Sequence, residues 1–133
     1  MESSMRDLSE YRYNCSVEAL EDAKIMYENG RYKNALNRAY YAIFHAIRAV
    51  NALHGYDSSK HSGVISYFNQ NFVKEEIFAK ETSKIIKKAY ESRERADYLD
   101  FYVASKEEAK EQIERAEKLQ DWIRKYLEKM DVL

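Results

Sequence analysis

The segment RAYYAIFHAIRAVNALHG, residues 38–55, is the strongest helix signal in the sequence, because small and large apolar residues recur along it at helical spacing. Alanines lie in and just before it at spacings of four, three, four and three: Ala35, Ala39, Ala42, Ala46 and Ala49. A row of larger side chains runs beside them: Leu36, Tyr40, Ile43, Ile47 and Val50. Small side chains let a second helix approach closely, and the larger row fills the adjacent groove. We therefore predict a helix over residues 31–54 that is central or lies at a subunit interface.

Turn signals are scarce in the rest of the chain. Its 133 residues contain no proline and three glycines, whereas a β-rich chain of this length would need more turn residues. Apolar spacing predicts further helices over residues 5–28, 64–73 and 78–97, and a last one that continues to the end. The sequence therefore predicts an all-α fold in a single domain over residues 1–133. We expect an antiparallel up-and-down bundle of four long helices plus one short helix.

Two helix starts carry a capping signal. In the loop before the short helix, Asp57, Ser58 or Ser59 is expected to cap its N-terminus with a side-chain oxygen. Before the last helix, Ser105 and Glu108 form a capping-box sequence, which predicts two reciprocal hydrogen bonds between side chain and backbone.

Composition excludes several classes of protein. The net charge is −1, so nucleic-acid binding would need a local basic patch. The single cysteine, Cys15, excludes an internal disulfide and a cysteine-based zinc site. No carboxylate pattern joins His54 and His61 into a metal site, and nothing points to an organic cofactor. No apolar run reaches membrane-spanning length and the N-terminus does not resemble a signal peptide, so we expect a cytoplasmic protein without membrane contact.

Arg38 and His45 lie seven residues apart and share a helix face with Tyr41 and Arg48. One interpretation is a ribonuclease-like pair, in which the arginine holds a phosphate and the histidine moves a proton near neutral pH. The other is a polar seam bonded to carboxylates of a neighbouring helix. We favour the seam, because the pair lies in the most apolar segment. With Ala39, Ala42 and Ala46, it would then form a helix-packing or dimer surface.

The segment ESRERADYLDFY, residues 91–102, carries the second candidate site. Arg93 falls on the buried side of its helix, where an arginine is costly unless paired, and Asp97 at i+4 is a natural partner. The pair is either a structural ion pair or, beside Tyr98 and Tyr102, a grip for a phosphate and a stacked base. Arg95 lies on the opposite face and would assist.

Four stretches together resemble the small, stand-alone prokaryotic HEPN-domain proteins (higher eukaryotes and prokaryotes nucleotide-binding), from about Tyr11 to Tyr126. They are NALNRAYYAIFHAIRAVNALHG, KHSGVISYFNQNFV, SRERADY and the capped C-terminal helix. The resemblance implies a helical bundle that pairs as a homodimer and is related to toxin–antitoxin modules, where a minimal nucleotidyltransferase is often the partner. Active members are metal-independent RNA endonucleases. Their motif is an arginine followed four to six residues later by a histidine, near the end of the third long helix.

This chain departs from that motif, because residues 93–102 contain no histidine. Arg93 with four intervening residues reaches Tyr98, and Arg95 with four reaches Asp100, with Tyr102 two residues further on. The resemblance thus implies a homodimeric module with a degenerate motif that binds RNA, a nucleotide or a nucleotidyltransferase. Its expected binding residues are Arg93, Asp97, Tyr98, Arg95 and Tyr102.

Two alternatives stay open. The first is an active, metal-independent ribonuclease in which Arg93 or Arg95 works with a displaced base, His61 or His45, brought in across the dimer. The second is a purely structural dimeric adaptor without a role in nucleic-acid binding.

Overall fold

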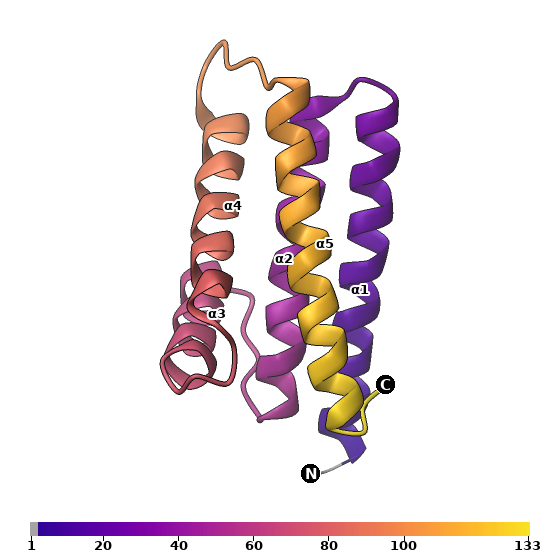
Figure 1. Cartoon of the computed structure of the whole chain (residues 1–133), viewed down its shortest axis with the longest axis vertical. Coiled ribbons are helices and arrows are strands. Elements are labelled where there is room, and N and C mark those ends of the chain that lie inside the picture. The colour runs from indigo at the N-terminus through magenta and orange to yellow at the C-terminus, as the bar shows by residue number, and fades with distance from the viewer. Residues whose placement is uncertain (1–2) are drawn as a thin grey trace.

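The computed structural model describes residues 3–133, so residues 1 and 2 of the predicted domain lie outside the described part. Its elements are α1 (Ser3–Glu28), α2 (Tyr32–Leu53), α3 (His61–Phe68), the π-helical segment η1 (Asn69–Val73), α4 (Lys80–Tyr98) and α5 (Lys106–Lys129). No strand occurs among these residues, and the predicted all-α fold is confirmed. Figure 1 shows α1, α2, α4 and α5 running up and down along one axis, with α3 beside the lower end of α4.

The alanine row of α2 faces α1. All five of its alanines are at most 1% exposed. Two buried serines of α1 donate hydrogen bonds across the contact, Ser9 to the carbonyl of Ala49 at 2.8 Å and Ser16 to that of Ala42 at 2.6 Å. Bonds from a short side chain to the backbone of the next helix require close helix approach, which small residues permit. The row is therefore a contact within the chain.

The short helix starts differently from the prediction. It begins at His61, its N-cap is Lys60, and no side chain caps it. The expected cap by Asp57, Ser58 or Ser59 is wrong. Arg12 and Arg48 hold the carboxylate of Asp57. Ser58 Oγ accepts from the backbone N–H of Lys60, the N-cap residue, instead of from an N–H inside the helix. The second half of the predicted segment is η1. Such π-helical turns are rare and are frequent at functional sites.

The start of α5 forms half of its capping box. Ser105 Oγ accepts a hydrogen bond from the backbone N–H of Glu108 at 3.0 Å. The carboxylate of Glu108 does not return to the backbone of Ser105. It instead accepts a hydrogen bond from the Tyr102 hydroxyl and lies 3.5 Å from Arg95. Glu108 thereby ties the loop between α4 and α5 to the bundle.

No helix within residues 3–133 is long and apolar enough to cross a membrane.

Candidate functional site

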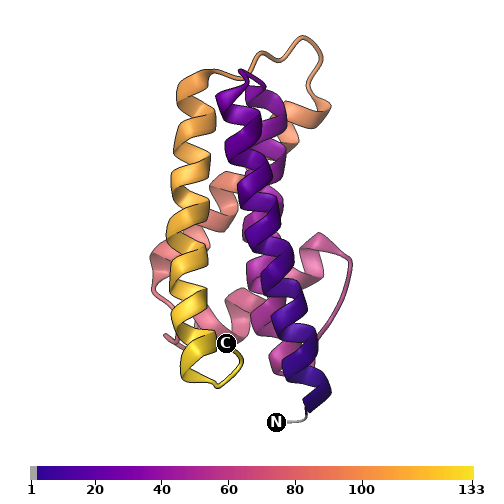
Figure 2. The ribbon, with the colours of Figure 1, turned by 90° about the vertical axis from the view of Figure 1, so that its right-hand side faces the viewer.

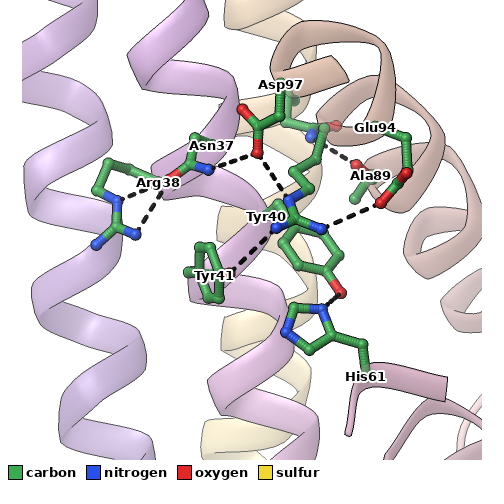
Figure 3. A network of polar contacts seen from close by, with 10 residues as sticks. Asn37, Arg38, Tyr40, Tyr41, His61, Ala89, Glu94 and Asp97 are labelled. Carbon is green, nitrogen blue, oxygen red and sulfur yellow. Dashed lines mark hydrogen bonds and ion pairs between the residues drawn. The ribbon is translucent and has the colours of Figure 1, made fainter.

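Arg93 lies near the C-terminal end of α4 and is surrounded by partners. Its side chain is 13% exposed. One terminal nitrogen lies 3.1 Å from Glu94 Oε1, and the other donates to the Tyr41 hydroxyl at 3.4 Å. Nε lies 2.9 Å from Asp97 Oδ2, but its N–H does not point at that oxygen, so the contact is an ion pair rather than a hydrogen bond. In Figure 3 the three residues that make these contacts, Asp97, Glu94 and Tyr41, lie around one point between the helices.

Three tyrosine rings also surround the guanidinium. Its central carbon lies 5.5 Å from the ring centroid of Tyr40, 5.7 Å from that of Tyr41 and 5.6 Å from that of Tyr98. These are cation–π distances. Tyr40 is fully buried, whereas Tyr98 is 67% exposed. The cation is thus held firmly on its inner side and borders an exposed aromatic face on its outer side.

A polar chain runs from Arg93 to Arg38 through a residue that the sequence pattern did not point to. Asn37 donates from Nδ2 to Asp97 Oδ2 at 3.1 Å. The Oδ1 of Asn37 accepts from Nε and Nη2 of Arg38 at 3.2 and 3.1 Å. Arg38 also lies over the ring of Tyr41, at 5.0 Å. Its guanidinium therefore bonds an amide on its own helix and not the carboxylate of a neighbouring helix that the seam interpretation expected.

Six of the residues that these contacts connect form what we call the Arg93 cluster, which Tyr40 and Glu94 border: Asn37, Arg38, Tyr41, Arg93, Asp97 and Tyr98. Half of the cluster lies on α2 and half on α4, so the packing of these two helices sets its geometry.

His61, the first residue of α3, contacts two of the tyrosines that surround Arg93. Its Nδ1 lies 2.8 Å from the hydroxyl of Tyr40. The imidazole stacks on Phe44 with ring centroids 4.3 Å apart, and its edge meets the ring of Tyr41 at 5.7 Å. Burial lowers the pKa of His61, and the positive charge of Arg93 lowers it further. His61 and Arg93 therefore share Tyr40 and Tyr41 as neighbours, although they lie far apart in the sequence.

His45 lies four residues, about one helical turn, after Tyr41 on α2. Its Nδ1 is buried and has no hydrogen-bond partner. Burial, assisted by the charges of Arg48, Arg12 and Arg38, lowers the pKa of this imidazole to about 4. Arg48 and Arg12 in turn hold Asp57, at 2.7 and 3.0 Å. His45 is therefore neutral at pH 7, in a setting made positive by arginines.

Arg95 and Tyr102 do not join the Arg93 cluster. Arg95 contacts Ser92 and Glu108, and Tyr102 donates to the same glutamate. Both side chains thus anchor the loop between α4 and α5. In the described part of the chain, no group of three histidine, cysteine, aspartate or glutamate side chains is arranged to hold a metal ion.

The Arg93 cluster presents groups of the kinds that suit a phosphate and an aromatic ring. The Nη1 of Arg38 finds no acceptor among residues 3–133, so it offers a free donor near the caged charge of Arg93. Arginine N–H groups suit phosphate oxygens, and the exposed ring of Tyr98 suits a stacked base.

Comparisons with known proteins agree with this fold. The family model of the HEPN domain matches residues 9–126, which include Arg38, His61 and Arg93. A UPF0332 protein of Thermotoga maritima is 38% identical over 119 residues, 90% of this chain and 90% of that protein. A Methanocaldococcus jannaschii protein named "Putative toxin" is 40% identical over 113 residues, 85% of this chain and 84% of its own. A second protein of that name and organism is 30% identical over 115 residues, 86% of this chain and 78% of its own.

Proposed function

The chain belongs to the HEPN-domain family, and from this premise we propose that it is a HEPN module that binds RNA or a nucleotide at the Arg93 cluster. One observation carries the proposal: the Arg93 guanidinium is caged by three tyrosines, of which Tyr98 leaves its ring open to solvent. A fixed cation beside an exposed ring is what a phosphate with its attached base requires. Arg38 supplies a second positive charge, which suits the next phosphate of an RNA chain.

The proposal includes a cellular setting. Two relatives carry the name "Putative toxin", which supports a role in a toxin–antitoxin system. By resemblance to nucleotidyltransferase-associated HEPN proteins, the chain would act as a homodimer with a minimal nucleotidyltransferase as its partner.

Binding without cleavage is favoured by the residues that follow Arg93. The α4 segment and the loop after it carry no histidine between residues 93 and 102. The carboxylates of Glu94 and Asp97 lie against the guanidinium, so part of its charge is already neutralised. Such a site suits recognition of a phosphate better than stabilisation of the extra negative charge of a transition state.

We expect Arg93→Ala to weaken the binding of mixed-sequence RNA about tenfold and to lower the salt slope of the affinity by about one unit. Each phosphate contact that is lost removes one released counterion, which is why the salt slope reports it. The measurement is a titration of fluorescent RNA in excess chelator at several salt concentrations. Arg124→Ala is the matched control, because Arg124 is also ion-paired but lies on α5.

Thermal unfolding of both variants shows whether the fold survives. Unchanged RNA affinity in a folded Arg93→Ala protein would contradict the proposal, and loss of the fold with unchanged affinity would make Arg93–Asp97 a structural ion pair.

A second candidate, a metal-independent ribonuclease, is favoured by one observation: His61 lies 2.8 Å from the hydroxyl of Tyr40, whose ring also contacts Arg93. A neutral imidazole with a lowered pKa is a competent general base, and the histidine missing from α4 would then come from α3.

Under the leading proposal, RNA incubated with the protein in chelator stays intact. If the protein does cleave RNA and His61→Ala lowers the rate about 100-fold or more, His61 is the base and the ribonuclease replaces the binding module. His45→Ala is measured beside it, because His45 is the other candidate base. It lies on the α2 face of Arg38 and Tyr41 but does not contact Arg93. Cleavage that survives both Arg93→Ala and His61→Ala would come from a contaminating nuclease.

A further inference from the structure

The loop between α4 and α5 presents apolar side chains to solvent. Leu99 is 53% exposed, Phe101 101% and Val103 86%; we call Leu99–Val103 the apolar loop. Its base is fixed, because Tyr102 donates to Glu108 and Ala104 is buried. Figure 2 shows it projecting from the end of the bundle opposite the termini.

The backbone of the apolar loop is strained at Phe101, whose ring is exposed to solvent. Phe101 has φ of 61°, in the left-handed region that residues other than glycine rarely adopt. Such a conformation is unfavourable for a residue that carries a side chain. No contact within the chain explains it, since the ring is fully exposed. The ring therefore gains no contact within the chain and stays available to another molecule.

A groove lies beside the opposite end of α4. It has a volume of about 760 Å³ and is bounded by α3, η1 and the N-terminal half of α4. Ile65 and Tyr90 supply apolar surface over the buried Ile86, and Lys74 and Lys87 supply positive charge. We call it the α3–α4 groove. Its size is that of a site for a small ligand or a few side chains.

The apolar loop and the groove complement each other in chemistry. Phe101 matches the apolar surface of Ile65 and Tyr90, and the exposed carboxylate of Asp100 matches the cations of the groove. One copy cannot bring them together. Lys87 and Tyr98 lie eleven residues apart on the same helix, which is about 16 Å, and the loop lies beyond that.

We propose that the apolar loop of one copy occupies the α3–α4 groove of a second copy, and that the two copies do so reciprocally. Along the chain, Glu94 lies midway between Lys87 and Phe101. A two-fold axis near Glu94, with the two α4 helices antiparallel, therefore places each loop on the other copy's groove. This contact is closed, whereas a one-way insertion would propagate into a filament. The inference rests on the homodimer of the proposed function but not on RNA binding.

The test is sedimentation equilibrium of the full chain over a range of concentrations. Phe101→Ser should raise the dissociation constant of the dimer about tenfold or more, because a central aromatic anchor is lost. Ile25→Ser is the matched control, since Ile25 is 54% exposed on α1, away from both surfaces, and should leave the constant unchanged.

A charge exchange then tests the pairing itself. Asp100→Lys and Lys87→Glu should each weaken the dimer, and the double variant should recover most of the loss, as expected for groups that interact directly. A dimer that neither Phe101→Ser nor Asp100→Lys weakens would overturn this contact and leave the homodimer standing on another face. A wild-type chain that stays monomeric would overturn both this contact and the homodimer. Because an axis near Glu94 borders the Arg93 cluster, the dissociation constant of the dimer is measured without RNA and alone decides this contact, and RNA titration of the same variants then shows whether loss of the dimer also lowers RNA affinity.

Discussion

Replacing Ala46 by leucine should lower the free energy of unfolding by about 3 kcal/mol, at the upper end of the range for overpacked cores. Ala46 is 0% exposed and belongs to the alanine row of α2 that faces α1. The added methyl groups have no space at this contact unless α1 moves away. That movement would lengthen the hydrogen bonds from Ser9 and Ser16 of α1 to α2 carbonyls, which are 2.8 and 2.6 Å long.

Urea denaturation followed by circular dichroism measures this loss. Ile43→Leu is the matched control on the same helix, because Ile43 is 1% exposed and the exchange conserves volume. The control should cost less than about 1.5 kcal/mol. If Ala46→Leu costs no more than the control does, α1 is free to shift, and the small side chains of the row are not what fixes the spacing of α1 and α2.

The parts of the structure that depend on local sequence could be predicted. The apolar period of α2 specifies a buried helix whatever its neighbours are, because the spacing alone determines which side chains share a face. The Arg93–Asp97 ion pair follows equally from spacing, since residues i and i+4 are neighbours on any helix, and the two side chains lie 2.9 Å apart.

The rest of the candidate site could not be predicted, because it depends on contacts between helices. Asn37 joins Asp97 only because α2 and α4 pack at one particular register. His61 meets Tyr40 only because α3 folds back against α2. The cap of α3 failed for a similar reason: Asp57 has the right chemistry for a cap, but two arginines from α1 and α2 hold its carboxylate. Competition of this kind is not visible in a single sequence.

Acidification should destabilise the protein through His45. The pKa of this imidazole is about 4 in the folded chain, below its ordinary value of 6.5. Between these two pH values the unfolded chain binds a proton that the folded chain does not, so the free energy of unfolding falls as the pH falls through this window. The full shift corresponds to about 3 kcal/mol, and since the imidazole is only partly buried, we expect a loss of about 2 kcal/mol.

His45→Gln isolates this contribution, because glutamine does not titrate. Asp57 also loses its stabilising ion pairs in acid, and the pKa values of His54 and His61 are lowered too, so both proteins become less stable as the pH falls. The difference between wild type and variant, measured by urea denaturation from pH 7.5 to 4, belongs to His45. Parallel profiles would mean that His45 accepts its proton in the folded chain as easily as in the unfolded one. The arginines around it would then not keep it neutral, and His45 would be able to act as an acid near pH 6.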